Sequence, residues 1–352
     1  MDAFTGHEFK HKNGETTFYY EGGPKDGPLL IFIHGWPDIA QTWQHQLKTF
    51  AGLGFRVVAP DMRGYGKSSC PRDRRAYQLE ILTGELVELL AQTGCSEAVW
   101  IGHDWGCGVV SAFVAHYPEL CTGVVLLCVP YATLERGVDF LVSLVNRDIY
   151  PESEYPYGQW EYMKAYEKDA DHMDEIFDSA PDKIAKIFYT KSSPATYGQP
   201  AMTSRVLREG GWFGGNPSAL PDIPLELTCL DEDLYANLAK QHKERGFFPA
   251  TSYYMNHDVN KKYDDKKKND GVLDMPMLYI DAIYDGVCSP TTSPKLAGPM
   301  RKKVKNLTET RIESMHWVHM DKPAEVNAAL AKWLATSLPK YWPYYYKNPL
   351  VN

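Results

Sequence analysis

The chain has 352 residues, 44% of them apolar, and carries a net charge of -8 from 37 basic and 45 acidic side chains. This composition is typical of a globular protein that buries a large core, and its acidic balance excludes nucleic acid as an expected partner. No apolar run approaches the about eighteen residues of a membrane helix and the start lacks a secretion signal, so we expect no membrane span and a cytoplasmic location.

Strand and helix patterns alternate over the first 130 residues. Two alternating segments flank Asn13-Gly14, a pair that is typical of a β-hairpin turn. Continuous apolar runs predict buried strands at "PLLIFIHGW", "RVVAPDM", "AVWIGHD" and "GVVLLCV". Helical spacing of apolar residues separates these strands at residues 43–50, 79–89 and 106–117. The alternation predicts an α/β fold, with a mostly parallel sheet flanked by helices.

The strand pattern stops after Pro130. Residues 131–270 are rich in aromatic, proline and charged residues with helical or irregular patterns, which predicts an inserted, largely helical lid. The lid ends near the charge run "KKYDDKKKNDG", which we expect to be a solvated linker. Strand patterns then resume at "MPMLYIDAIYD" and "LTETRIES". The predicted division is therefore a core of residues 1–130 and 271–352 that builds one sheet, interrupted by the lid.

Two segments have no clear place in this division. The lid segment 205–220, which contains "EGGWFGGNP", has a role that the sequence does not reveal. The tail "YWPYYYKNPLVN" is unusually aromatic for a chain end, so we expect it to pack on the core. A homodimer contact is the alternative function of such an aromatic surface.

The stretch Gly102-His103-Asp104-Trp105-Gly106 has the pattern G-x-D-x-G after a predicted strand. It matches the nucleophile elbow G-x-S-x-G with the serine replaced, which makes Asp104 the candidate nucleophile. The alternative is that Asp104 merely caps the following helix. The loop "HGWP" follows the first buried strand, so the backbone N–H groups of Trp36 and Trp105 are the candidate oxyanion-hole donors.

An acid and a base follow at the ends of later strands. Asp285 ends the strand in "MLYIDAIYD", and His316 lies just past "LTETRIES". Nucleophile, acid and histidine in this order form one of the known catalytic triad arrangements. Asp281 is the rival acid, less suited because it lies inside its strand, and His319 is the rival base.

The stretches "HGWPD", "DMRGYGKSS", "GHDWG", "YDGV" and "HWVHMDKP" resemble the epoxide hydrolase branch of the α/β-hydrolase family over nearly the whole core. The resemblance implies an α/β-hydrolase fold with a cap and conversion of epoxides to vicinal diols. It implies an ester on Asp104 that is hydrolysed by water activated by His316 and Asp285. His316 is the histidine that matches the family's His-Trp pair. Such catalysis needs no cofactor and no metal, and the seven cysteines show no metal-ligand spacing.

The resemblance also implies two lid tyrosines that hold the epoxide oxygen. Tyr157 in "YGQW" and Tyr254 in "SYYMN" match the family's positions, while Tyr162, Tyr166 and Tyr253 are competitors. The predicted substrate-binding residues are Trp36, Trp105, Tyr157, Tyr254 and Trp317.

The expected partner is a small apolar epoxide, since the lid is rich in aromatic residues. Two alternatives remain open. A haloalkane dehalogenase uses the same aspartate nucleophile but needs halide-binding N–H donors in place of paired tyrosines. A non-catalytic ligand-binding relative would typically have lost a catalytic residue.

Overall fold

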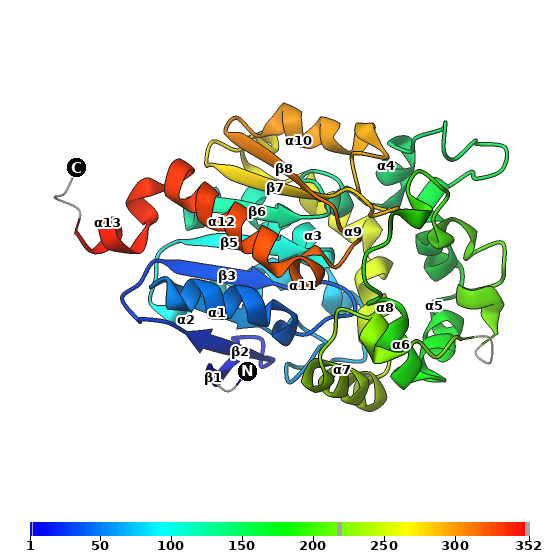
Figure 1. Ribbon diagram of the computed structural model, residues 1–352, viewed down its shortest axis with the longest axis horizontal. Helices are drawn as coiled ribbons and strands as arrows, with labels where there is room; N and C mark the ends of the chain where they lie inside the picture. The colour runs from blue at the N-terminus through cyan, green and yellow to red at the C-terminus, as the bar shows by residue number, and fades with distance from the viewer. Residues whose placement is uncertain (2, 217–219, 349–352) are drawn as a thin grey trace.

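The computed structural model describes residues 1, 3–216 and 220–348 and contains one eight-stranded sheet in the order β1-β2-β4-β3-β5-β6-β7-β8 (Figure 1). The strands are β1 (Thr5–Lys10), β2 (Thr16–Gly22), β3 (Leu29–Ile33), β4 (Arg56–Pro60), β5 (Ala98–His103), β6 (Cys121–Leu127), β7 (Met277–Ala282) and β8 (Leu307–Ile312). β1 and β2 pair antiparallel around Asn13-Gly14, which confirms the predicted hairpin. β2 pairs antiparallel with β4, and every pair from β4 to β8 is parallel.

Helices cover both faces of the sheet. α1 (Gln44–Gly52) and α12 (Pro323–Ser337) pack together on one face, and α2 (Leu79–Thr93) and α3 (Trp105–His116) pack together on the other (Figure 1). Strands β3, β5 and β7 are buried along their whole length because neither of their faces reaches water. This explains why their sequences read as continuous apolar runs rather than alternating patterns.

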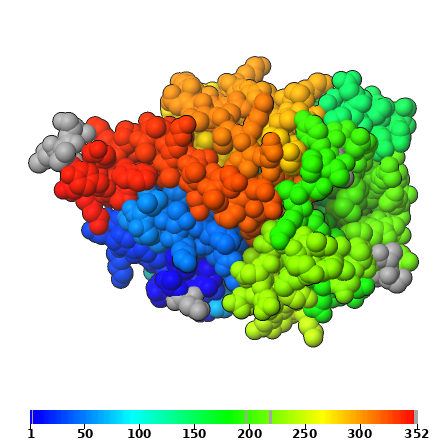
Figure 2. Space-filling model, viewed as in Figure 1, coloured from blue at the N-terminus to red at the C-terminus, as the bar shows by residue number. Residues whose placement is uncertain are grey.

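A cap is inserted between the end of β6 and the start of β7, and it lies over one end of the sheet (Figure 1). In the space-filling view it forms the green side of the molecule, beside the core (Figure 2). Its helices are α4 (Val138–Ser143), α5 (Glu161–Asp178), α6 (Pro181–Ile187), α7 (Glu232–Arg245), α8 (Phe248–Ser252) and α9 (His257–Asp264). Among the described residues from 131 to 270, the single β pairing is the bridge Thr190↔Thr228. The limits 131–270 of the lid remain a prediction within these outer bounds.

The charge run at residues 261–271 is solvated, as expected, because most of its side chains are exposed, but it is not an irregular linker. It forms the last turns of α9 and a short 3-10 helix, η12 (Lys268–Gly271). Some of its charges are paired: Lys268 lies 2.8 Å from Glu119 and Asp270 lies 2.5 Å from Lys303. The run mixes both signs, so its side chains can bridge neighbouring segments instead of repelling one another.

The start of the aromatic tail packs on the core, as predicted. The Tyr341 hydroxyl donates to the carbonyl of Leu29 at 2.9 Å, and Trp342 packs on Phe55 at 5.5 Å between ring centroids. The three tyrosines of the terminal helix α13 (Pro343–Lys347) are exposed, and residues 349–352 lie outside the described part of the chain. Among the described residues, no helix is both long enough and apolar enough to cross a bilayer.

Candidate active site

Asp104 occupies a sharp turn between β5 and α3. Its φ of 53° lies in the left-handed region, which is unfavourable for a residue with a side chain. The turn closes because its neighbours are glycines: a Cβ on Gly106 would lie 2.1 Å from the carbonyl oxygen of Ile33, and one on Gly102 would lie 2.7 Å from that of Gly106. The Asp104 side chain makes no capping hydrogen bond to α3. The alternative role as a helix cap is therefore wrong.

One carboxylate oxygen of Asp104 is held by the loop after β3. The backbone N–H of Trp36 donates to Asp104 Oδ1 at 2.7 Å. A Cβ on Gly35 would lie 2.5 Å from the same oxygen, so this close approach requires glycine. Trp105, the second predicted donor, is the first residue of α3, and the contact of its N–H with the nucleophile remains a prediction.

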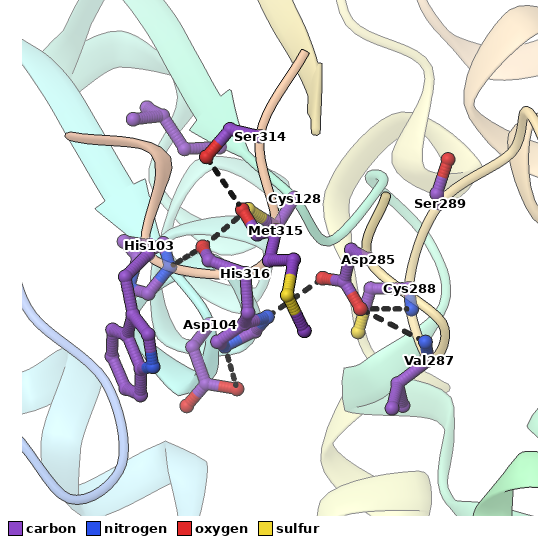
Figure 3. A network of polar contacts seen from close by, with 12 residues as sticks. His103, Asp104, Cys128, Asp285, Val287, Cys288, Ser289, Ser314, Met315 and His316 are labelled. Carbon is purple, nitrogen blue, oxygen red and sulfur yellow. Dashed lines mark hydrogen bonds and ion pairs between the residues drawn. The ribbon is translucent and has the colours of Figure 1, made fainter. Parts of the chain in front are cut away.

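His316 lies between two carboxylates (Figure 3). Its Nδ1 donates to Asp285 Oδ2 at 2.7 Å, and its Nε2 lies 3.4 Å from Asp104 Oδ2. The other oxygen of Asp285 accepts from the backbone N–H groups of Val287, at 2.9 Å, and Cys288, at 3.0 Å. The acid is thus fixed on both oxygens, and its orientation in turn fixes the imidazole.

The charges of this triad are strongly coupled. Burial alone would lower the pKa of the His316 imidazole, but the carboxylates of Asp285 and Asp104 outweigh burial and raise it to about 10. Burial would likewise raise the pKa of the Asp285 carboxyl, but the charge and hydrogen bond of His316 hold it below its usual value. At neutral pH the free site therefore holds an imidazolium between two carboxylates.

Two side chains of the core hold the backbone of His316 in place. The backbone carbonyl of His316 accepts from His103 Nε2 at 2.8 Å and from Cys128 Sγ at 3.0 Å (Figure 3). His103 therefore supports the site rather than reacting in it. The sequence did not indicate the Cys128 thiol as a support of the base, since this contact joins residues 188 positions apart.

The rival acid Asp281 and the rival base His319 have partners outside the triad. Asp281 accepts hydrogen bonds from Ser289 Oγ at 2.7 Å and from Thr291 Oγ1 at 2.5 Å. The His319 ring is fully buried and packs on Trp43 at a centroid distance of 4.4 Å. Neither rival contacts Asp104, so the geometry favours Asp285 and His316.

Two groups around His316 have His, Cys or carboxylate ligand atoms within 4.8 Å of one another. These groups are His103, Cys128 and His316, and Asp285, Cys288 and His316. Both share atoms with the hydrogen bonds that fix His316. A metal ion at either position would therefore compete with the triad.

The cap places Tyr254, in η11 (Tyr253–Met255), over the nucleophile turn. Its ring packs edge-on against Trp105 at 5.1 Å and Tyr162 at 5.6 Å between centroids. Burial raises the pKa of both tyrosines well above the usual value, and the charge of Asp104 adds to the rise in each. Both phenols therefore remain protonated at neutral pH and are able to donate hydrogen bonds near Asp104.

Tyr157 does not take the position that we predicted for it. It precedes the 3-10 helix η5 (Gly158–Trp160), is partly exposed, and lines an open surface depression of the cap together with Lys164 and Leu207. The chain turns at Gly158, whose φ is 55°, so that α5 enters the cap interior only after this point. Tyr162, one of the competitors, lies beside Tyr254 instead and replaces Tyr157 as the candidate.

The other competitors have different partners. The Tyr253 hydroxyl donates to the carbonyl of Arg63 at 2.8 Å. The Tyr166 hydroxyl accepts from the indole N–H of Trp212 at 3.0 Å. Trp317, predicted to bind substrate, stacks on Tyr189 of the cap at 4.3 Å, and its N–H donates to the carbonyl of Phe188. Its direct contact with substrate remains a prediction.

Comparison with known proteins places this geometry in a family. A model of the alpha/beta hydrolase fold matches residues 28–323. The chain belongs to the α/β-hydrolase fold family. The fold predicted from the resemblance is thus confirmed, and the crystal structure of epoxide hydrolase A from Mycobacterium thermoresistibile agrees, with a TM-score of 0.73, 25% identity and coverage of 95% of this chain and 98% of that one.

Curated relatives of this α/β-hydrolase are also named epoxide hydrolases. Epoxide hydrolase B of Mycobacterium tuberculosis is 29% identical over 90% of this chain and 93% of its own length. Bifunctional epoxide hydrolase 2 of Sus scrofa is 30% identical over 97% of this chain and 56% of its own length. The chain therefore spans about half the length of the mammalian relatives that it matches.

Proposed function

We propose that this α/β-hydrolase opens epoxides to vicinal diols through a covalent ester on Asp104. The observation that carries the proposal is the combination of an aspartate at the nucleophile turn with two buried, protonated tyrosines beside it. The names of the relatives support the same activity. The expected substrate is a small apolar epoxide, because the described cap residues around Tyr254 are aromatic.

In the first step, Asp104 Oδ2 attacks an epoxide carbon and the C–O bond of the ring breaks. Oδ1 is the oxygen held by Trp36, so Oδ2, which lies 3.4 Å from His316 Nε2, is the one left to attack the substrate. The leaving oxygen stays tethered and gains negative charge, and Tyr162 and Tyr254 would stabilise it by donating hydrogen bonds and a proton. Carboxylate attack yields an ester, which can be hydrolysed, whereas serine attack would yield a stable ether.

In the second step, His316 activates a water molecule that attacks the ester carbon of Asp104. Esterification removes the negative charge of Asp104, which is one of the two charges that raise the pKa of His316. The imidazolium then releases its proton more readily, and this proton replaces the one that a phenol gave to the leaving oxygen. The neutral imidazole takes a proton from the attacking water, while Asp285 orients it and stabilises the imidazolium that forms. The oxyanion would form on Oδ1, beside the N–H of Trp36, with the N–H of Trp105 as its second donor. Its collapse breaks the bond between the Asp104 carbonyl carbon and the product oxygen, which takes up the remaining proton of the water and leaves as the diol, so that the Asp104 carboxylate is regenerated.

The alternatives fit this site less well. A haloalkane dehalogenase needs N–H donors around a departing halide, and phenol hydroxyls beside the nucleophile suit an alkoxide better. A non-catalytic binding protein would not need His316 between two carboxylates at 2.7 Å and 3.4 Å. A cytoplasmic location and a homodimer contact through the aromatic tail remain predictions.

The test compares epoxides with haloalkanes. The purified protein and its Asp104→Ala variant are incubated with a styrene-type epoxide and with a bromoalkane of similar size, and diol and bromide are quantified. Diol formation that depends on Asp104, without bromide release, is the expected result. Bromide release without diol would move the protein to the dehalogenase function, and no turnover of either class would favour the binding protein.

A further inference from the structure

Trp212 lies in the interior of the cap, in the lid segment whose role the sequence does not reveal; residues 217–219 of that segment lie outside the described part of the chain. Trp212 begins the 3-10 helix η8 (Trp212–Gly215), and only 3% of its surface is exposed. Its ring contacts Phe188 at 5.4 Å, Phe177 at 5.8 Å and Tyr162 at 5.8 Å between centroids. The indole thus touches one of the two tyrosines proposed to hold the epoxide oxygen.

The backbone of this segment is shaped to place that ring. Gly210, Gly211, Gly214 and Gly215 all have positive φ, and so does Phe213, for which this conformation is unfavourable. A Cβ on Gly211 would lie 2.6 Å from the side chain of Ile176 in α5, and one on Gly215 would lie 2.6 Å from the carbonyl of Gly210. The tight loop therefore needs its glycines both for conformation and for close packing on the cap.

Trp212 is also bonded to the tyrosine cluster. Its Nε1–H donates to the Tyr166 hydroxyl at 3.0 Å, and the Tyr166 ring packs on Tyr254 at 4.9 Å. An indole N–H can only donate, so the Tyr166 oxygen is the acceptor. This hydrogen bond fixes the hydroxyl end of the Tyr166 ring. Trp212 therefore contacts Tyr162 and Tyr166, two of the aromatic residues that pack on Tyr254.

The Trp212 indole belongs to a row of packed aromatic rings that reaches the loop after β3. This aromatic wall consists of Trp212, Phe188, Phe177 and Trp36. Phe188 and Phe177 pack on Trp36 at 5.0 Å and 5.8 Å between centroids. Trp36 donates to Asp104, so the wall runs from the reacting carboxylate to Trp212. Centroid distances of 5–6 Å are contact distances for aromatic pairs, which leaves no room for a substituent between these rings.

We propose that Trp212 determines substrate specificity by closing the cap end of the substrate pocket. The inference rests on the proposed function, and it names the substrate class: epoxides with one compact or flat substituent, in preference to epoxides that carry a second bulky group on the other ring carbon. The bulk of the indole sets the end wall. Its N–H positions Tyr166, which is a positioning residue and supports Tyr254.

The experiment measures kcat/KM for two epoxides, one with a single phenyl group and one with a phenyl group on each ring carbon, in the wild type and three variants. Trp212→Ala removes the wall and is expected to change the ratio of the two values at least about tenfold in favour of the diphenyl epoxide. Tyr166→Phe keeps the ring and removes only the oxygen that accepts the hydrogen bond of Trp212. It is expected to lower kcat for the two epoxides by the same factor, which leaves their ratio within about threefold of the wild type. Trp212→Phe removes the hydrogen bond and also part of the bulk of the wall, so its ratio is expected to shift in the same direction as that of Trp212→Ala but by a smaller factor.

A ratio of two substrates measured on one preparation is not affected by a smaller folded fraction. If Trp212→Ala does not fold, Trp212→Leu serves the same purpose and is expected to shift the ratio in the same direction. An unchanged ratio in a folded small-side-chain variant would overturn the inference. If the wild type converts neither epoxide, it is the proposed function that fails, and the two failures are thereby distinguished.

Discussion

The core and the cap hold their parts of the site by different means. In the core, Asp104, Asp285 and His316 are fixed by short polar contacts and by backbone turns that only glycine neighbours allow. In the cap, Tyr162 and Tyr254 are fixed mainly by aromatic packing on short helices and 3-10 turns. In the proposed mechanism the core would supply the nucleophile, the acid and the base, whereas the cap would supply the donors to the leaving oxygen and select among epoxides.

The largest effect is expected from removing the nucleophile. Asp104→Ala should lower kcat/KM for any epoxide by about 10⁴-fold or more, because no ester can form. Steady-state diol formation measures the loss, and circular dichroism checks that the variant is folded. Activity above about one hundredth of the wild type would mean that the core does not act through this carboxylate.

Removing the base should separate the two steps of the core. His316→Gln should leave ester formation largely intact and slow ester hydrolysis by about 10³-fold, since the water loses its general base. Mass spectrometry of the peptide that contains Asp104 should then show a gain equal to the mass of the epoxide. Loss of both steps together, with no adduct, would contradict the assigned role.

The cap tyrosines should have a smaller effect, and they come with a matched control. Tyr162→Phe and Tyr254→Phe should each slow ester formation by about 10²-fold, because each removes one hydrogen-bond donor to the leaving oxygen. Tyr157→Phe, on the outer face of the cap, should change the rate by less than about twofold. Rapid-mixing kinetics of adduct formation provide the rates. If Tyr157→Phe proved as slow as Tyr162→Phe, the cap assignment would be reversed.

The smallest effect concerns the charge balance of the core. The pKa of His316 is raised to about 10 in the folded protein, above the usual value of about 6.5 in an unfolded chain. Its protonation therefore stabilises the fold fully below about pH 6.5, and this contribution is lost as the pH rises through about 10. Asp104→Asn removes one of the charges that raise the pKa, so NMR titration of the imidazole should give a lower value.

Thermal unfolding tests the same balance. Between pH 7 and pH 10 the unfolding temperature of the wild type should fall more than that of Asp104→Asn, by about 2 °C. The difference between the two proteins isolates His316 from other groups that titrate in this range. An equal slope in both would show that Asp104 does not influence His316.

The sequence located the core residues because parallel strands end at one edge of a sheet. Residues that follow the buried strands β3, β5 and β7 must therefore meet there, and only His316 needed the added match to a family pattern. Asp285 could be chosen over Asp281 because a residue inside a strand cannot reach that edge.

The cap has no comparable rule. Tyr157 and Tyr162 are separated by five positions, and the turn at Gly158 decides which of them points inward. Trp212 could not have been predicted either, since its contact with Tyr166 joins segments 46 residues apart through a run of left-handed backbone. The exposure of the charge run at residues 261–271 was predicted, but its helical structure was not, because its composition does not reveal the ion pairs with Glu119 and Lys303.

The central claim, a covalent ester on Asp104, is tested most directly by a single turnover in oxygen-18 water with the enzyme in excess over a styrene-type epoxide. The ester mechanism predicts that the diol carries unlabelled oxygen from Asp104, and that the label from water appears in the peptide that contains Asp104. A diol labelled from water, with no label in that peptide, would show direct hydration of the epoxide and contradict the ester mechanism.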